Sequence, residues 1–429
     1  MLPKPIFGYA KPKFNYELLS TKLPQPVPIA MPASVTLLLP REMGPKPSPN
    51  LKPGTRVKTG QLLTWDDQPG PAIVSSVTGT ITALNAYLGD YGRKYAAITI
   101  SPETKDEWDE QFAQACGEIS LQTMVDFLSS APGAPGLDKL NRSATPIHSI
   151  VIYGGDTDLL VDTSLFVLKS RINDLENGVR ILKKVTGIEK MVLAVPGESF
   201  QNFDGHLPLE VRAVPNTYPY GQPLMIYYQV FDKIIDQGQT LESQGVVFLS
   251  AEAVASIGQA VSKAQIPVQK LLTVLDKKGQ KQLVSARIGT PIGDILKAMN
   301  ITLNNRDRLI IGGPMTGTAI YSVDQPILPN TGAIMVQDNQ QIIPTSDYPC
   351  INCGECIRVC PANVAVNMLV RSLEAGQYQD AADLYDLYSC VECGLCSFTC
   401  VSRIPILQYI KLAKFELARL APVEEENNE

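Results

Sequence analysis

The sequence predicts a multidomain protein that combines α/β and α+β folds and ends in a helical domain with metal-binding cysteines. Three observations lead to this prediction. The chain has 429 residues, enough for two to four domains. Residues 146–265 alternate strand-like and helix-like apolar segments, which is typical of an α/β layer with parallel strands. Eight of the nine cysteines lie between positions 350 and 400.

The composition excludes several functional classes. Lys and Arg total 37 and Asp and Glu total 43, so the formal net charge is −6. This balance excludes a generally basic nucleic-acid-binding protein, and no nucleic-acid partner is expected. No segment approaches 18 uninterrupted apolar residues, so no transmembrane helix is expected. The first residues lack the apolar core of a signal peptide, which favours the cytosol.

The N-terminal quarter is predicted to be β-rich. Residues 1–33 are rich in proline and should form a meandering arm. Short strands broken by Gly and Pro are expected from Val35 to about Ile100. Segments 52–62 and 73–81 resemble a lipoyl-like barrel-sandwich but lack the Met-Lys-Met or Asp-Lys-Ala sequence at which such domains are modified. We therefore assign residues 1–101 to an arm and a barrel-sandwich without a covalent cofactor.

The central part predicts two further domains. An α/β domain is expected over residues 102–265, with strands at 147–152, 191–195 and 245–249 and helices at 164–186 and 251–264. Residues 266–339 look like a β-grasp module with a strand at 271–275, a turn at 277–279, a helix at 291–299 and a strand at 308–311. The glycine-rich loop at 312–317 is explained equally well as a ligand-binding loop or a tight turn.

The cysteines follow the spacing C-x2-C-x2-C-x3-C twice, and the first run ends Cys360-Pro361. This run binds [4Fe–4S] clusters, because three closely spaced cysteines on one loop can reach three iron corners. Gly354 and Gly394 lie inside the two runs, where the backbone must wrap closely around the inorganic core. Cys116 stands apart and is expected to be a small buried hydrophobic residue.

In two-cluster ferredoxins, the fourth cysteine of each run ligates the other cluster. We therefore assign four ligands to the first cluster, namely Cys350, Cys353, Cys356 and Cys400. The second cluster then takes Cys390, Cys393, Cys396 and Cys360. Two four-thiolate zinc sites would use the same number of cysteines, although zinc sites usually show separate C-x2-C pairs. The second run departs slightly from the pattern, since Val401 rather than proline follows Cys400.

The segments around the two runs are predicted to be helical. Residues 367–374 and 380–387 carry apolar positions at helix spacing and are separated by Gly376. Residues 406–420 form an amphipathic helix that either packs on the cluster module or lies against a membrane partner. Residues 424–429 form an acidic tail. We assign residues 340–429 to an α-helical ferredoxin domain.

These pieces, in this order, resemble the C subunit of the Rnf complex, a membrane-bound ferredoxin:NAD+ oxidoreductase. The resemblance rests on segments 57–62, 177–184, 218–221 and 312–317, and above all on the two cysteine runs with residues 404–410. It implies that residues 102–265 form an α/β domain related to the flavoprotein of complex I. It also implies two [4Fe–4S] clusters, FMN, an NAD(H) site, membrane-embedded partner subunits and a peripheral place on the cytoplasmic face of the membrane.

The sequence departs from that family at three places, all in its flavin and nicotinamide pocket. The family's Gly-x-Gly-Gly-Ala-Gly-Phe-Pro loop matches residues 131–137, where two prolines occur. Its Glu-x-Glu-Pro-Tyr segment matches Gly155, Asp156 and Asp158, whose carboxylates would alternatively cap the next helix. Its Gly-Gly-Glu matches Gly221 and Gln222. Since prolines remove the donors that cradle phosphates, we favour a chain without NAD(H) and leave FMN open.

The favoured function is an iron–sulfur electron-transfer subunit of an Rnf-type oxidoreductase complex, exchanging electrons with a soluble or membrane-bound partner. Two alternatives stay open: a stand-alone flavin and iron–sulfur reductase of the cobalamin-reductase type, and a full NADH-oxidising, FMN-containing subunit. No catalytic side chain is predicted, because cofactors would carry the chemistry. His148, expected on a buried strand, and His206, in a polar loop, are both interpreted as structural.

Overall fold

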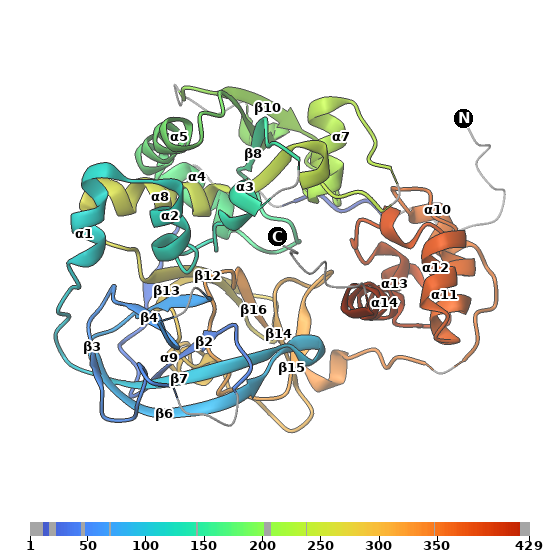
Figure 1. Ribbon diagram of the computed structural model, residues 1–429. Helices are drawn as coiled ribbons and strands as arrows, with labels where there is room; N and C mark the ends of the chain where they lie inside the picture. The colour runs from blue at the N-terminus through green and yellow to red at the C-terminus, as the bar shows by residue number, and fades with distance from the viewer. Residues whose placement is uncertain are drawn as a thin grey trace. The chain divides into compact units, whose positions relative to one another are not determined.

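The computed structural model describes residues 12–16, 23–43, 48–67, 70–142, 145–200, 207–236, 238–346 and 348–420 (Figure 1). The chain forms two compact units. The sheet unit consists of Tyr16–Asn216 and Thr240–Ile342, and the cysteine unit of Met1–Asn15, Thr217–Gln239 and Ile343–Glu429. His206, much of the predicted arm and the acidic tail at 424–429 lie outside the described residues.

The first layer of the sheet unit is a four-stranded parallel sheet, as the alternating pattern predicted. Its strand order is β10-β9-β8-β11. The strands are β8 (Ser149–Tyr153), β9 (Lys190–Pro196), β10 (Glu210–Val214) and β11 (Val246–Ser250). Every residue of β8 is buried, which fits a central parallel strand that is covered on both faces.

Three helices accompany this sheet: α4 (Thr163–Ser170), α5 (Ile172–Thr186) and α8 (Ala251–Lys263). The prediction of one helix over 164–186 is wrong, because Arg171 leaves the helical region at φ −128° and ψ 39°. The two halves bury their residues differently. α4 buries the four consecutive side chains at 165–168, whereas α5 is amphipathic and buries Leu175, Val179 and Leu182 along one stripe. A change of direction at Arg171 lets each half present its own buried face.

Helices α5 and α8 approach each other through glycines. A Cβ atom added to Gly178 would lie 2.0 Å from the carbonyl oxygen of Val254, and one added to Gly258 would lie 1.9 Å from that of Asp174. Both distances are far below any van der Waals contact, and both opposing atoms belong to the backbone. The two helices therefore pack at a separation that only glycine permits at these positions.

Replacing Gly178 with alanine is expected to destabilise the sheet unit by about 1–3 kcal/mol, because the new methyl group must push the two helix backbones apart. A loss of stability would be informative, because alanine is the better helix former by up to about 1 kcal/mol and would raise stability if it caused no clash. Both tryptophans of the chain, Trp65 and Trp108, lie in the sheet unit, so tryptophan fluorescence during urea unfolding measures the change. Gly117→Ala is the matched control, because nothing lies within 4 Å of its added Cβ. Equal stability of the two variants would contradict the close approach.

The N-terminal strands form two antiparallel sheets, with orders β2-β7-β6-β3 and β4-β5. Their core includes Leu37, Leu63, Ile81 and Ile98, all nearly fully buried. The predicted run of short strands between Val35 and Ile100 is confirmed. The strands are β2 (Val35–Leu39), β3 (Arg56–Val57), β4 (Leu62–Thr64), β5 (Ala72–Val74), β6 (Gly79–Leu88) and β7 (Lys94–Pro102).

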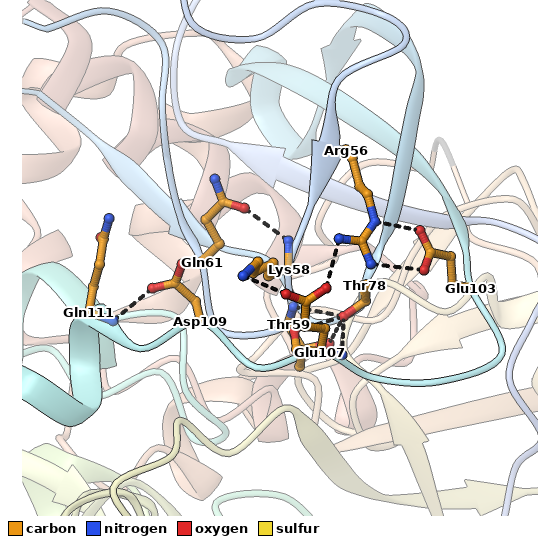
Figure 2. Close-up of polar contacts among 9 residues, drawn as sticks. All are labelled: Arg56, Lys58, Thr59, Gln61, Thr78, Glu103, Glu107, Asp109 and Gln111. Atoms are coloured by element: carbon orange, nitrogen blue, oxygen red, sulfur yellow. Dashed lines mark hydrogen bonds and ion pairs between the residues drawn. The ribbon is translucent and has the colours of Figure 1, made fainter.

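A polar network covers one edge of these strands (Figure 2). Arg56 forms ion pairs with Glu103 at 2.8 Å and with Glu107 at 2.7 Å, and Lys58 lies 2.5 Å from Glu107. The Thr78 hydroxyl joins the segment that follows β3 to the chain at Glu107, because it accepts from the Thr59 amide and donates to the Glu107 carbonyl. The two carboxylates raise the pKa of Arg56 above its usual value. Since the ion pairs are exposed, they fix the position of this segment more than they stabilise the fold.

A six-stranded mixed sheet completes the sheet unit, with the order β1-β13-β12-β16-β14-β15. The predicted sequence of strand, turn, helix and strand is confirmed, and Gly279 turns the hairpin at φ +74°. β1, from the arm, adds a parallel edge strand. The elements are β1 (Val27–Pro28), β12 (Gln269–Leu275), β13 (Lys281–Arg287), α9 (Ile292–Ala298), β14 (Arg308–Ile311), β15 (Thr318–Ile320) and β16 (Ala333–Gln337).

The described part of the cysteine unit is mainly helical. The helices are α7 (Pro223–Phe231), α10 (Glu355–Val359), α11 (Val366–Glu374), α12 (Tyr378–Leu384), α13 (Leu395–Thr399) and α14 (Ile406–Leu420) (Figure 1). Predicted helices at 367–374, 380–387 and 406–420 correspond to α11, α12 and α14. Ile406, Ile410 and Ala413 of α14 are buried in the core of the unit, and Leu407 is buried as well. Of the two interpretations of this helix, packing on the cysteine unit is the one observed.

Shorter elements connect these layers: α1 (Gln111–Ala115), α2 (Leu121–Leu128), α3 (Asp138–Arg142) and α6 (Gly197–Phe200), with single 3-10 turns at 90–92, 116–118, 242–244, 339–341 and 387–389. The fold as a whole is a mixed α/β, multidomain one. The boundaries at residues 101, 265 and 339 stay a prediction. The segment Thr217–Gln239, which lies inside the predicted α/β domain, groups with the cysteine runs.

Candidate metal centre

The two cysteine runs adopt the same local fold. In each, a loop reaches a glycine in the left-handed region, Gly354 at φ +78° or Gly394 at φ +75°, and a five-residue helix follows directly. Asn352 and Glu392, at equivalent places two residues before those glycines, also have positive φ. The glycines therefore turn the backbone sharply within each run, whereas its wrapping around an inorganic core stays a prediction. The two runs form a structural repeat.

Four thiols from both runs surround one cavity. Cys350, Cys353 and Cys356 of the first run and Cys400 of the second line it, together with apolar side chains such as Val370 and Ile404. The pKa of the Cys356 thiol is raised to about 11, mainly by burial and in part by the other three thiols of this set. The fourth cysteine of the second run thus lies with the first three of the other run.

The remaining four thiols form a second group. The pKa of Cys393 is raised to about 12, mainly by burial and in part by the thiols of Cys390 and Cys360. Burial raises the pKa of Cys396 as well, with further contributions from the same two neighbours. Cys360, the last cysteine of the first run, therefore lies among the thiols of the second run.

Backbone and side-chain donors fix the loops that carry these thiols. The Glu392 amide donates to Cys390 Sγ and the Ile404 amide donates to Cys400 Sγ, both at 3.4 Å. The Lys414 ammonium donates to the carbonyl oxygen of Cys390 at 2.9 Å. The buried Tyr218 hydroxyl donates to the carbonyl oxygen of Cys393 at 2.5 Å. Tyr218, close to α7, and Lys414, on α14, thus hold the second run from two sides. Sequence reasoning assigned this role to neither residue, although Tyr218 begins the segment 218–221 on which the resemblance partly rests.

The two thiol groups fit [4Fe–4S] clusters in donor chemistry. Each supplies four thiols, which is the ligand count of a cubane. Within the described ranges, no three or more His, Cys, Asp or Glu side chains are placed to hold a single metal ion. The thiols of the first group line a cavity. Buried thiols with raised pKa values are neutral unless a positive centre replaces their protons, which is what iron does on binding.

The weaker flavin and nicotinamide candidates divide between the units. Gly155, Asp156 and Asp158 belong to the sheet unit, whereas Gly221 is a buried residue of the cysteine unit. A Cβ on Gly155 would lie 2.6 Å from the Tyr153 hydroxyl, so protein atoms fill the space beside it. The Asp156 carboxylate accepts the amides of Ser164 and Leu165, at 2.8 and 3.2 Å. It therefore caps the start of α4, as the structural alternative proposed.

Asp156 is expected to make the stability of the sheet unit depend on pH. Burial raises its pKa to about 7, so the folded protein binds this proton more tightly than the unfolded chain does. Stability should therefore fall as pH rises from about 4 to about 7, by up to about 1.4 kcal/mol per pH unit. Unfolding at a series of pH values should show this decline in the wild type and in Asp90→Asn, an exposed control, and a flatter profile in Asp156→Asn. Parallel profiles would contradict the assignment.

Asp158 holds the glycine-rich loop at 312–317. Its carboxylate accepts the amides of Met315 at 3.2 Å and Thr316 at 2.8 Å, and the Thr316 hydroxyl at 2.7 Å. Gly313 permits this approach, since an added Cβ would lie 2.5 Å from Asp158. Of the two interpretations of this loop, the turn is supported, because a carboxylate from the chain itself takes the loop's donors. Sequence spacing gave no signal, because the partners are more than 150 positions apart.

The segment that matches the family's flavin loop packs against the start of α8. Gly133 has φ +88°, and a Cβ there would lie 2.5 Å from the Ala253 amide nitrogen. The Gly133 amide donates to the Pro329 carbonyl at 2.8 Å, and the Ser256 hydroxyl donates to the Pro132 carbonyl at 2.8 Å. Ala131 and Leu137 are fully buried. Hydrogen bonds and close packing against other parts of the chain therefore hold this segment in place.

The predicted burial of His148 is wrong. His148 precedes β8 and is exposed, with Nδ1 2.8 Å from the Ser149 hydroxyl. The strand starts one residue later, so the ring lies at the rim of the sheet. Cys116 is partly buried against the core of the sheet unit, and burial raises its pKa.

Known proteins are similar to this chain over most of its length. A family described as the 4Fe-4S dicluster domain matches residues 349–404. The C subunit of the ion-translocating oxidoreductase complex of Edwardsiella ictaluri is 24% identical over 91% of this chain. The C subunit of the proton-translocating ferredoxin:NAD(+) oxidoreductase complex of Clostridium ljungdahlii is 25% identical over 91% of it. This chain is a homologue of the C subunits of such complexes.

The lengths of these relatives differ. The chain spans 51% of the Edwardsiella ictaluri protein and 60% of that of Yersinia enterocolitica, but 90% of the Clostridium ljungdahlii protein. Two solved structures of an NAD+-reducing [NiFe]-hydrogenase, air-oxidized and H2-reduced, show a partial likeness. Their identities are 17% and 14% and their TM-scores are 0.45 and 0.44. The likeness covers 62% and 72% of this chain and 55% and 63% of those chains. Among the described residues, no helix has the length and apolar character needed to cross a bilayer.

Proposed function

We propose that this chain is the iron–sulfur electron-transfer subunit of an Rnf-type oxidoreductase complex. One [4Fe–4S] cluster would be held by Cys350, Cys353, Cys356 and Cys400, and the other by Cys390, Cys393, Cys396 and Cys360. The observation that carries the proposal is the sorting of eight thiols into two groups of four, each with three cysteines from one run and the last from the other.

Bound clusters would supply one-electron transfer at potentials set by their surroundings. The chain's own residues provide those surroundings. Val370, Ile404 and Ile406 give the first thiol group an apolar wall, which limits access of water. Backbone amides donate to the sulfur atoms of Cys390 and Cys400, and Lys414 places a positive charge beside the second run. Donors and cations near a cluster stabilise its more negative, reduced state.

The homologues support a place for this chain within a larger assembly. The relatives are named as subunits of ion-translocating complexes, so membrane-embedded and other subunits of an Rnf-like complex are the proposed partners. A peripheral position on the cytoplasmic face of the membrane is proposed on the same ground. The detailed fold assignments are part of this proposal: a lipoyl-like barrel-sandwich, a complex-I-flavoprotein-like α/β domain, a β-grasp module and an α-helical ferredoxin domain.

We propose further that the clusters exchange electrons with a donor other than NADH. Asp156 and Asp158 are occupied by contacts within the chain, and the segment at 131–137 is packed against α8. Backbone amides that are bonded within the chain are not available to a ligand. A phosphate group would therefore find fewer free hydrogen-bond donors here than the family's sequence pattern provides. FMN stays an open cofactor, and the full NADH-oxidising subunit and the stand-alone reductase stay the alternatives.

The test uses anaerobically purified full-length protein. Iron, acid-labile sulfide, zinc and flavin are measured on one preparation, and NADH is titrated against the EPR signal of the clusters. About eight irons per chain, with no flavin and no response to NADH, is the expected result. About eight irons with flavin and reduction by NADH would restore the full family function. Zinc in place of iron would refute the proposal as a whole.

A further inference from the structure

The cysteine unit contains a second cavity that the cluster proposal does not use. Its volume is about 420 Å³, which lies within the range of about 300–1,000 Å³ common for small-molecule sites. One wall comes from α7 and the segment that follows it, and the other from the loops next to Cys360 and Cys390. All of these residues belong to the cysteine unit.

The cavity adjoins the second thiol group along the chain. Pro361, which follows Cys360, and Val391, which follows Cys390, both line it. Two of the four thiols proposed to hold the second cluster are thus one residue away from its wall. An occupant of this cavity would lie beside the loops that carry that group.

The walls present aromatic rings and hydrogen-bond donors. Tyr228 comes from α7 and Tyr388 from the loop beside Cys390, and the two residues are 44% and 39% exposed. Leu224 and Met225 add apolar surface from α7. Donors lie on both walls, with Gln229 and Lys233 on the α7 side and Asn363 and Ser389 on the loop side. Such walls suit a flat ring that has an acceptor at each end.

The charges favour a neutral occupant. Among the described lining residues, Lys233 and Asp236 carry the formal charges, and they cancel. The lining takes residues from both ends of α7, so the dipole of this helix favours neither charge. A phosphate-bearing nucleotide would find no surplus of cations here.

We propose that this cavity binds a neutral, planar ring of the quinone class, with its carbonyl oxygens accepting from donors on the two walls. A redox role for such a site rests on the proposed function, because it requires the second cluster beside the cavity. Binding itself does not depend on it. The cavity is formed by other residues than the flavin and nicotinamide candidates Gly155, Asp156 and Asp158 of the sheet unit, whereas the fourth candidate, Gly221, directly follows Tyr220 of its lining.

The test is equilibrium dialysis of anaerobically purified full-length protein against menadione, FMN and NADH in separate arms. Menadione is expected to bind at one site per chain, at least tenfold more tightly than FMN or NADH. Two variants alter the cavity: Tyr228→Ala removes a ring that is already half exposed, and Met225→Trp fills space. Each should weaken menadione binding at least tenfold. Tyr321→Ala, which removes a ring that is 92% exposed in the sheet unit, is the matched control and should bind as the wild type does.

Three results would overturn the inference: no menadione binding, tighter binding of FMN or NADH, or unchanged binding in both cavity variants. Iron and sulfide measured on the same samples separate this failure from a failure of the proposed function. Eight irons without menadione binding would refute the quinone site alone. Menadione binding that both cavity variants weaken, in protein without iron, would support the site and refute the clusters. Circular dichroism of each variant shows that it is folded.

Discussion

Replacing Cys360 and Cys390 together with alanine is expected to leave about four irons per chain, whereas replacing Cys360 and Cys350 together is expected to leave almost none. The reason is the exchange of the last cysteine between runs. Cys360 lies among the thiols of the second run, so the first pair of changes damages one cluster twice and the second pair damages both. Iron and sulfide analysis of the purified variants measures the difference directly.

The reciprocal pairs make the test symmetrical. Cys400→Ala with Cys350→Ala should retain about four irons, and Cys400→Ala with Cys390→Ala should lose nearly all. Cys116→Ala is the matched control and should keep the iron content of the wild type, because this thiol belongs to the core of the sheet unit. If each run held its own cluster, the results of the paired variants would be reversed, and the proposed ligand sets would be wrong.

Replacing Lys270 with methionine is expected to destabilise the sheet unit by about 3–5 kcal/mol. Lys270 on β12 forms an ion pair with Glu252 at the start of α8, and their side chains are only 1% and 6% exposed. Removing the ammonium group leaves a carboxylate that is buried without its partner, and this is costly because water cannot reach it. Urea unfolding followed by the fluorescence of Trp65 and Trp108 reports the change.

The double variant Glu252→Gln with Lys270→Met separates the ion pair from simple loss of packing. With both charges removed, most of the lost stability should return, because well-packed neutral residues often replace a buried ion pair at little cost. Lys278→Met, in the turn after β12, is the control for the loss of a lysine. A double variant as unstable as Lys270→Met would show that packing, and not the unpaired charge, causes the loss.

Much of the fold followed from local sequence, because its elements are set by nearby residues. Strand β8 and helix α8 could be predicted from apolar runs and the glycine and serine residues around them. The cysteine runs could be predicted as a repeat because both the spacing and the left-handed glycines are local. The alternatives for α14 and for the loop at 312–317 could not be resolved in this way, since each depends on what packs against it.

The errors have the same origin. The break at Arg171 arises because α4 and α5 bury different faces, which a continuous apolar period conceals. The contact of Asp158 with Thr316 and that of Tyr218 with Cys393 join residues more than 150 positions apart. The grouping of α7 with the cysteine runs is a tertiary feature of the same kind. Such contacts cannot be predicted from local sequence patterns.

The composition of the cysteine unit has a consequence for biosynthesis. Its α7 segment leaves the ribosome long before the rest of the unit with which it groups, because α7 ends at Phe231 and α14 ends at Leu420. At roughly 5–20 residues per second, this gap corresponds to a delay of about 10–40 s. During that interval the sheet unit gains its last six strands, β11 to β16, while α7 lacks the rest of the cysteine unit. The cysteine unit can therefore assemble only after the sheet unit has been synthesised, and the proposed clusters would be inserted last.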